Sequence, residues 1–461
     1  MTERDAPTEP SRRRVLAAAG VGLAGALTGC GYRPGGGDLA WESSLGGGGL
    51  FGPGDRWFRP VGDRLFVVRN RSGRTYDFED DAWRDYENAG VTALDPTGET
   101  RLEAETERQA AGPPAVTEGA VVVPVAGDRV TAIDRETAAF DLDDPTVDED
   151  GSGADEPDPI RWQVDIGAAT ADESSGSDGS TESDDGATDD GPSASVDAVR
   201  ASDRVVAAVL PDDTVVLDAE TGDRAFDLAA AWPGVTELGP GAVAPDRVAV
   251  DGEDVWVVVT GLDAASGSDA DAVLARFDPT GERRVTRPLS SGADWLVVVD
   301  DTVVVGNTSG DSVRGFDRSL DRRFALDVPT PRERPPLVEG GGSDDAVGAC
   351  VYLRRGETAR ALDVAAGEIA WERDGLPASR PFAADERGIY AVGREAVREG
   401  SRETRPVIVA VGAGGGDRWS APLPDGVRVE ALFAVGDRLL VVDGEELYGF
   451  RAAPGERWSL L

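Results

Sequence analysis

The sequence contains no histidine and no lysine, so all 46 of its basic side chains are arginine. Without histidine the chain cannot form a Ser-His-Asp triad, a Cys-His pair or an imidazole metal site. The side chains left for chemistry are Asp, Glu, Tyr, Ser, Arg and one internal cysteine. The composition therefore excludes most of the common catalytic centres.

Cysteine is also scarce, since Cys30 and Cys350 are the only two. Two cysteines this far apart do not indicate a disulfide framework. Cys350 lies in the apolar segment 348–352, which favours a buried, inert thiol over a reactive one. Long helical periodicity is missing after the N-terminal segment, whereas short valine-rich runs such as 255–259 are typical of strands.

Negative charge is in large excess, with 87 acidic residues against 46 basic ones and a formal net charge of −41. One interpretation is an acidic surface that receives a basic partner. The other is adaptation to a saline environment, in which dense carboxylates stay hydrated and their mutual repulsion is screened. The acid is spread along the whole chain, which favours the second interpretation, and it argues against nucleic acid as a partner.

The first thirty residues resemble an export signal, and we leave them out of the fold. Arg12 and Arg13 resemble the pair of a twin-arginine signal over residues 1–29, and the apolar run that follows is too short to span a bilayer. Leu27 to Cys30 resembles a lipobox, which implies lipidation of Cys30 and an extracytoplasmic membrane location. Two acyl chains would be needed for stable anchoring. A plain membrane-anchoring N-terminus is the alternative, and residues 30–38 are interpreted as a glycine-rich tether.

A short phrase recurs eight times after residue 38: an apolar strand ending in an Ala-x-Asp-like turn, a glycine, and often Trp or Phe. Its clearest copy contains Asp363, Gly367 and Trp371. The aspartate can accept backbone N–H bonds that close a turn, and the glycine can take the positive φ that the turn needs. The copies end at residues 95, 134, 218, 278, 317, 363, 411 and 451, and Asp95, Asp218 and Asp278 take the turn position. We expect the aromatics Phe226, Phe324, Trp371, Trp419 and Trp458 to pack over the blades.

This phrase resembles the tryptophan-docking repeat of the pyrroloquinoline-quinone-like β-propellers, and the whole chain resembles haloarchaeal exported lipoproteins. The resemblance implies an all-β propeller over residues 39–461, with eight four-stranded blades or, as the alternative, seven. Leu39 to Glu42 is nearly the same phrase as residues 369–372, which end a repeat. We therefore expect the N-terminal strand to join the last blade and close the ring, which leaves no strand edge unpaired.

Two insertions interrupt the repeats. Residues 170–195 are acidic and rich in Ser and Gly, and their composition predicts disorder. Before them, residues 160–164 are expected to finish the second blade, and the acidic stretch 141–151 lacks the spacing of an EF-hand. Residues 71–88 carry Tyr76, Trp83 and Tyr86, which could form a contact surface or, the interpretation we favour here, a packed loop lid.

The resemblance leaves several functions open, since the family includes quinoprotein alcohol dehydrogenases and non-enzymatic scaffolds, among them a lipoprotein of the outer-membrane β-barrel assembly machinery. The enzymes are expected to carry adjacent cysteines and a calcium ion, and this chain has no Cys-Cys pair. We therefore expect a non-catalytic surface lipoprotein without cofactor or metal that binds an exported or membrane protein. The alternatives are binding or hydrolysis of a small ligand or glycan in the central funnel, and a quinoprotein-type oxidoreductase.

Overall fold

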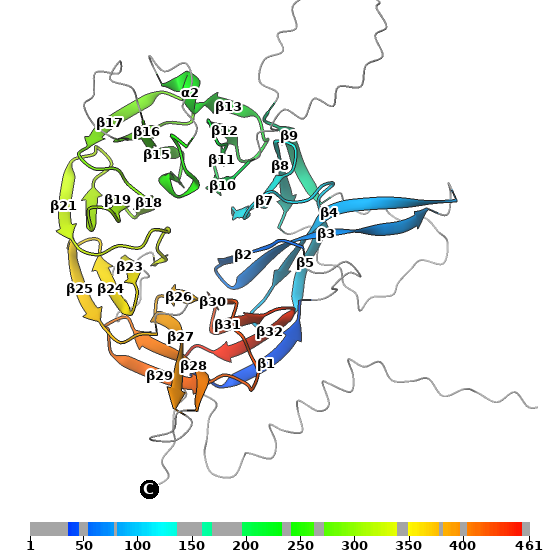
Figure 1. Ribbon diagram of the computed structural model, residues 1–461. Helices are drawn as coiled ribbons and strands as arrows, with labels where there is room; N and C mark the ends of the chain where they lie inside the picture. Colours follow the sequence, from blue (N-terminus) through cyan, green and yellow to red (C-terminus); the bar gives the residue numbers. More distant parts are fainter. Residues whose placement is uncertain are drawn as a thin grey trace, which may run out of the picture.

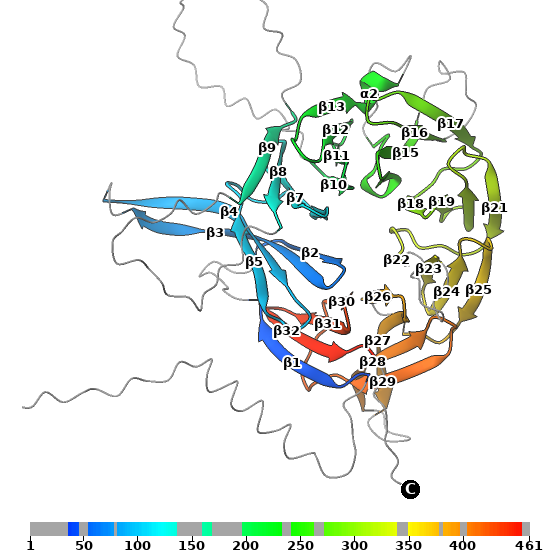
Figure 2. The same cartoon turned by 180° about the vertical axis from the view of Figure 1, so that it is seen from behind.

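The computed structural model describes residues 36–45, 54–77, 81–135, 159–167, 196–232, 241–261, 272–338, 349–377, 381–396 and 403–453. In these residues the strands form eight antiparallel sheets of four strands each, arranged as blades around a ring (Figures 1 and 2). The helical elements that they contain are short: α2 (Leu228–Ala231) and η1 (Pro245–Arg247). The prediction of an all-β, eight-bladed propeller is confirmed, and the seven-bladed alternative is wrong.

The strands of the blades follow one another in chain order, and we number the blades from the N-terminus. Blades 1 to 4 contain β2 (Arg56–Val61), β3 (Arg64–Asp77), β4 (Ala82–Leu94) and β5 (Thr100–Glu105); β6 (Ala115–Val116), β7 (Ala120–Val125), β8 (Arg129–Asp134) and β9 (Ile160–Asp165); β10 (Ala198–Ala201), β11 (Val205–Val209), β12 (Thr214–Asp218) and β13 (Arg224–Asp227); β14 (Val248–Asp251), β15 (Asp254–Thr260), β16 (Ala272–Phe277) and β17 (Arg283–Leu289). Blades 5 to 8 contain β18 (Trp295–Val299), β19 (Thr302–Asn307), β20 (Ser312–Phe316) and β21 (Arg322–Asp327); β22 (Leu337–Val338), β23 (Cys350–Arg355), β24 (Thr358–Asp363) and β25 (Glu368–Arg373); β26 (Phe382–Asp385), β27 (Gly388–Ala396), β28 (Thr404–Gly412) and β29 (Asp417–Pro422); β30 (Ala431–Val435), β31 (Arg438–Asp443), β32 (Glu446–Arg451) and β1 (Leu39–Ser44).

Blade 8 closes the ring, because its outermost strand comes from the other end of the chain. Strand β1 pairs antiparallel with β32, with Trp41 opposite Gly449 and Ser44 opposite Glu446. The predicted closure by an N-terminal strand is thus confirmed. Strand β9 pairs with β8, so the prediction that residues 160–164 finish the second blade is confirmed as well.

The hydrophobic core lies between blades. The buried apolar residues form eight clusters, and each cluster draws on two consecutive blades. Second strands such as β7 and β11 are buried along their whole length, because both faces of the sheet meet a neighbouring blade. The outermost strand β25 instead alternates between exposed and half-buried residues. Each blade is therefore stabilised mainly by its two neighbours.

The turn after the third strand is closed by the predicted aspartates. The Oδ1 atom of Asp95 accepts the backbone N–H of Thr97 at 2.8 Å and of Glu99 at 3.1 Å. Asp278 repeats this with Thr280 and Glu282, both at 2.9 Å, and Asp218 with Glu220 and Thr221, both at 2.9 Å. Asp363 accepts one such bond, from Ala366 at 2.8 Å. These carboxylates hold the turn, and each occupies the same place in its blade.

The aromatic side chain of one blade packs on the turn of the next blade. Trp371 of blade 6 lies against Gly415 of blade 7, and its indole Nε1–H donates to the carbonyl of Ala413 at 2.6 Å. Trp41 does the same across the ring closure, with Gly98 and with the carbonyl of Pro96 at 2.7 Å. The glycine is required twice over, because it has positive φ and because the ring leaves no room for a Cβ atom.

Six blades carry an aromatic residue at this docking position, on the fourth strand beside a β-bulge. They are Trp41, Trp162, Phe226, Phe324, Trp371 and Trp419. Leu102 and Val285 stand at the equivalent register in blades 1 and 4. Trp458, which the sequence also suggested, lies outside the described residues. The expectation that these aromatics pack over the blades is thus made specific, because each joins its own blade to the next one.

Candidate functional site

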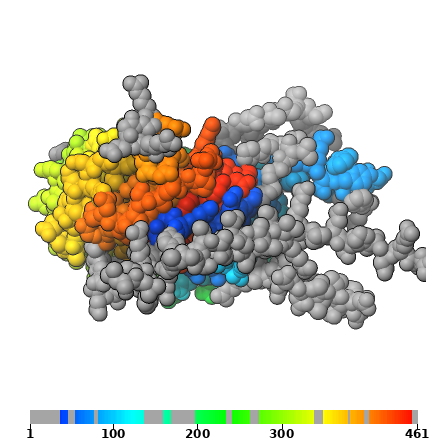
Figure 3. Space-filling model, turned by 90° about the horizontal axis from the view of Figure 1, so that it is seen from below, coloured from blue at the N-terminus to red at the C-terminus, as the bar shows by residue number. Residues whose placement is uncertain are grey.

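A two-stranded arm projects from blade 1 beyond the edge of the ring (Figures 1 and 3). It consists of the described residues in 71–88, where β3 and β4 stay in register as far as the pair of Asp77 and Ala82. Strand β2 pairs with β3 only as far as Arg69, and β5 pairs with β4 only as far as Gly90. Among the strands that the structure describes, β3 and β4 pair beyond these residues only with each other, so no described strand covers the outer edges of the arm.

Aromatic side chains lie on both faces of the arm. Tyr76 is opposite Trp83 on one face, with their rings edge to face and the centroids 5.3 Å apart. On the same face the Arg74 Nε atom lies 2.6 Å from an oxygen of Asp85. Tyr86 lies over Gly73 on the other face. Trp83 is 66% exposed and Tyr86 is 39% exposed, so their rings contribute little to the core.

The favoured prediction of a packed loop lid over residues 71–88 is wrong. The segment extends two blade strands by cross-strand pairing, and its Trp83 and Tyr86 rings are exposed to solvent instead of covering a hollow. Exposed tryptophan and tyrosine are enriched at protein interfaces, and unpaired strand edges can accept a strand from another chain. The arm is therefore a candidate protein-interaction site, which was the other interpretation open at the sequence level.

The root of the arm is fixed to the body of the propeller. Asn70 donates from Nδ2 to the carbonyl of Ala110 at 2.9 Å and accepts the Ala110 N–H at 2.7 Å. Glu105 of β5 receives Arg71 on one oxygen and Asn88 on the other, both at 2.7 Å. An isolated hairpin is marginally stable in water, so these bonds matter for the direction in which the arm is presented.

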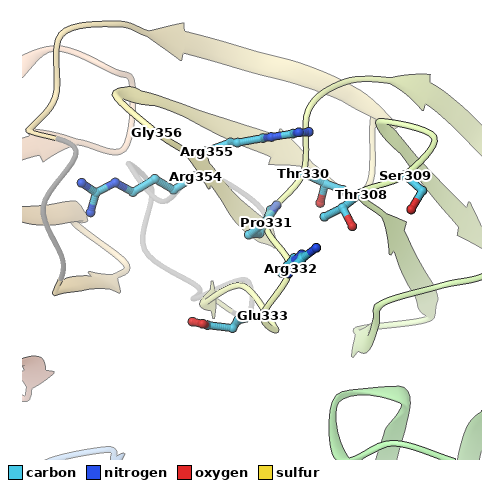
Figure 4. Close-up of a pocket in the computed structure, with 9 residues that line it drawn as sticks. All are labelled: Thr308, Ser309, Thr330, Pro331, Arg332, Glu333, Arg354, Arg355 and Gly356. Carbon is cyan, nitrogen blue, oxygen red and sulfur yellow. The ribbon is translucent and has the colours of Figure 1, made fainter.

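A polar hollow of about 400 Å³ lies between blades 5 and 6 (Figure 4). Thr308, Thr330, Arg332, Arg354 and Arg355 are among its lining residues. The guanidinium groups of Arg354 and Arg355 point in opposite directions in Figure 4, and Arg355 pairs with Asp311 while Arg354 donates to a backbone carbonyl. The lining groups do not converge on one point, so the hollow does not favour a specific ligand.

The most connected group of buried titratable side chains lies in blade 7. Tyr390 donates its hydroxyl proton to Asp385 at 2.9 Å and accepts from Arg418 at 3.1 Å, and Arg387 lies 2.9 Å from the same carboxylate. Burial raises the pKa of Asp385 above its usual value, against the opposing effect of these bonds. The members satisfy one another, so the arrangement fits a structural network that joins strands β26, β27 and β29.

Several predicted residues lie outside the described part of the chain: Arg12, Arg13, Cys30, the rest of the proposed signal 1–29, and the acidic insertion 170–195. Of the predicted tether 30–38, residues 36–38 are described, and there Gly36 and Gly37 lie against Trp419 as the docking turn that completes the ring. In the residues that the structure describes, no helix is long and apolar enough to cross a membrane, and no group of three acidic or cysteine side chains is placed to hold a metal ion. Cys350 is buried with a free thiol.

Comparison with known proteins gives one family match and several distant structural similarities. Residues 31–141 match the family model described as outer membrane protein assembly factor BamB. This stretch includes blade 1 and the arm but is less than half of the chain. No curated protein matches the sequence.

Among solved structures, BamB from Moraxella catarrhalis is 14% identical over 90% of this chain and 99% of its own, with a TM-score of 0.49. Sqt1 from Saccharomyces cerevisiae is 8% identical over 92% and 100%, also with a TM-score of 0.49. The computationally designed protein Ika8 is 12% identical over 91% and 97%, with a TM-score of 0.40. At these identities no function is carried over.

Proposed function

We propose that this chain is a non-catalytic scaffold that binds another protein of the cell envelope through the arm of blade 1. The exposed Trp83 with the half-buried Tyr76 packed against it, beside a strand edge that no described strand covers, is the observation that carries the proposal. The arm contributes aromatic area and a backbone edge, while Asn70 and Glu105 hold its root. A partner that adds a strand to this edge would satisfy the free backbone groups and cover both rings.

Two further observations support a binding role. The family match to assembly factor BamB covers residues 31–141 and therefore the arm. A propeller also joins a rigid ring to loops and extensions that can vary without disturbing the blades. Because β1 pairs with β32 and closes the ring, a partner bound to the arm is attached to a propeller whose first and last strands are joined.

A photocrosslinking experiment tests the arm. A photoreactive phenylalanine analogue is placed at Trp83, at Tyr86 and at Glu357, an exposed residue in blade 6 that serves as the matched control. We expect the same protein to be captured from intact cells at positions 83 and 86 and not at 357. Equal capture at all three positions, or capture of nothing at 83 and 86, would contradict the proposal.

We also propose that the chain is exported folded and held by lipid on Cys30 at the outer face of the cytoplasmic membrane. The support is the twin-arginine-like pair Arg12 and Arg13 and the lipobox-like residues 27–30. The acidic surface fits an outer environment rich in salt. Cys30→Ser is expected to release the protein into the medium, and replacing both arginines by lysine is expected to keep it in the cytoplasm. Unchanged membrane association of Cys30→Ser would refute the lipid anchor without affecting the arm.

A further inference from the structure

Three arginines, two in the inner strands of blades 1 and 3 and one in the connection between blades 5 and 6, lie on the inner side of the ring. Arg59 lies in β2, Arg200 in β10 and Arg334 in the connection between β21 and β22, which extends inward from the rim in Figure 1. The Arg200 Nη2 atom donates to the carbonyl of Pro245 at 2.8 Å, and the Arg334 Nη1 atom donates to the carbonyl of Val248 at 3.4 Å. Two of these axial arginines therefore reach the same short segment of blade 4.

Among the residues that the structure describes, the axial arginines Arg59, Arg200 and Arg334 carry more positive charge than neighbouring carboxylates neutralise. Among the described residues, Asp246 is the carboxylate that pairs with them, 3.4 Å from Arg200. Elsewhere a single arginine contacts several carboxylates. Arg101 contacts both Asp95 and Glu99, and Arg318 contacts three carboxylates. A site with three cations and one anion is unexpected in a chain whose formal net charge is −41.

The electrostatics of this cluster show that the three charges interact. Burial, followed by the charges of Arg200 and Arg59, lowers the pKa of Arg334 to about 9, and Asp246 opposes the shift. Burial and the charge of Arg59 also lower the pKa of Arg200, again against Asp246. Like charges held together in this way disfavour one another, so a bound anion would relieve the repulsion.

Some hydrogen-bond donors of the cluster have no partner among the described residues, and solvent can reach the cluster. Arg59 makes no hydrogen bond or ion pair with any residue that the structure describes, and its side chain is exposed although burial lowers its pKa. The exposure and the lowered pKa together fit an Arg59 side chain that solvent reaches although protein surrounds it. The Arg200 Nε atom is buried without a hydrogen-bond partner among the described atoms.

We propose that Arg59, Arg200 and Arg334 bind a small polyvalent oxyanion on the axis of the propeller. Three guanidinium groups and one carboxylate leave two positive charges, which an anion of charge −2 would balance. Guanidinium groups bind the paired oxygens of phosphate and carboxylate through parallel N–H bonds, so the ligand class includes phosphates and dicarboxylates. This inference does not depend on the arm and stands or falls separately from the proposed scaffold function.

Calorimetric titration of the full chain at constant ionic strength, with sodium chloride as background, tests the proposal. Inorganic phosphate and succinate are the two probes, and binding of either one supports the site and identifies the ligand class. We expect Arg334→Gln to weaken binding by about tenfold, the factor for one charge-assisted hydrogen bond of roughly 1.5 kcal/mol. Arg405→Gln, which removes an exposed arginine paired with Glu395, is the matched control and should leave binding unchanged.

A second variant gives the opposite sign and guards against a folding defect. Asp246→Asn removes the carboxylate that competes for the axial arginines, so it should tighten anion binding severalfold. A misfolded variant would not bind more tightly. The proposal is overturned if neither probe binds the unmodified chain, or if Arg334→Gln, Asp246→Asn and Arg405→Gln all bind with the affinity of the unmodified chain.

Discussion

Two separate glycine-to-alanine variants in blade 6 distinguish the cost of backbone strain from the cost of a disturbed contact between blades. Gly367 has φ of +68°, and a Cβ atom added there would lie 2.8 Å from the Cβ of Phe324 in blade 5. Gly356 has φ of +63°, and a Cβ atom added there would meet nothing within 4 Å. The two sites share the same strained conformation and the same blade, so Gly367→Ala and Gly356→Ala differ in the contact with Phe324.

The size of the difference follows from three terms. The left-handed conformation costs an alanine about 1–2 kcal/mol at either site. The lower entropy of the unfolded alanine chain returns about 0.4–1 kcal/mol at either site. At Gly367 the forced displacement of Phe324 adds about 1–3 kcal/mol, the usual cost of overpacking. We therefore expect Gly356→Ala to destabilise the fold by about 1 kcal/mol and Gly367→Ala by about 2–4 kcal/mol.

Urea unfolding in the salt of the native buffer, followed by tryptophan fluorescence, measures both variants. The same substitution of Gly367 in a Phe324→Ala background completes a double-mutant cycle. There the contacts of the added Cβ atom with Cγ and Cδ1 of Phe324 are gone while the contact with Cβ remains, so the cost should fall toward that of Gly356→Ala. Equal destabilisation by Gly356→Ala and Gly367→Ala, or an unchanged cost of Gly367→Ala in the Phe324→Ala background, would refute docking between blades.

Three further predictions concern single side chains. Trp41→Ala should lower the free energy of unfolding in urea by about 3–5 kcal/mol, because it removes the contact that closes the ring. Trp83→Ala on the arm should change it by less than about 0.5 kcal/mol. Equal losses of stability in the two variants would contradict the docking role of Trp41. Burial acts to raise the pKa of Asp278, but the bonds from Thr280 and Glu282 and the charge of Arg284 outweigh it and lower this pKa below its ordinary value. The stabilising effect of the Asp278 carboxylate is therefore present above the unfolded pKa of about 3.9 and lost as the pH falls through the folded value. Asp278→Asn should flatten the acid limb of the stability–pH profile. An unchanged acid limb would count against a stabilising role of this carboxylate. Burial and then the charge of Asp363 raise the pKa of the Cys350 thiol to about 11, so at pH 8 its peptide should resist alkylation in mass spectrometry until urea unfolds the chain, and rapid labelling of the folded protein would contradict the burial.

The repeat made the architecture predictable because it encodes a local turn. Asp278 closes its turn with bonds to residues two and four positions on, which the chain can form without knowing the rest of the fold. Six of the eight copies of the phrase end in such an aspartate, and eight copies, one per blade, indicate eight sheets. The N-terminal strand was predictable for a similar reason, since Trp41 occupies the docking position that Trp371 occupies in blade 6.

The partner of each docking residue could not be read from the phrase. Trp371 and Gly367 lie four positions apart in one repeat, which suggests that they touch, but Gly367 receives Phe324 of blade 5 and Trp371 packs on Gly415 of blade 7. The offset of one blade is a property of the assembled ring. Leu102 and Val285 were missed at the same register because they lack the aromatic signal.

The axial arginines were beyond prediction for a stronger reason. Arg59, Arg200 and Arg334 are separated by more than a hundred residues each and stand in no shared motif. Their proximity arises only when eight blades turn the inner strands toward one axis. Composition pointed the other way, because a chain with such an acidic excess gives no hint of a local cationic site.

The arm connects the architecture to the proposed function through its register. Because β3 and β4 run without a break from buried blade residues to the pair of Tyr76 and Trp83, the ladder that anchors Val68 opposite Val91 also sets the face on which the exposed Trp83 lies. A shift by one residue would move Trp83 to the opposite face of the arm and turn Val91 from the cluster shared with blade 2 toward the one shared with blade 8. The core of blade 1 therefore fixes the orientation of a surface that adds nothing to core stability. Packing alone gives no reason for an exposed tryptophan at the end of such a ladder, whereas a partner that contacts this face of the arm does.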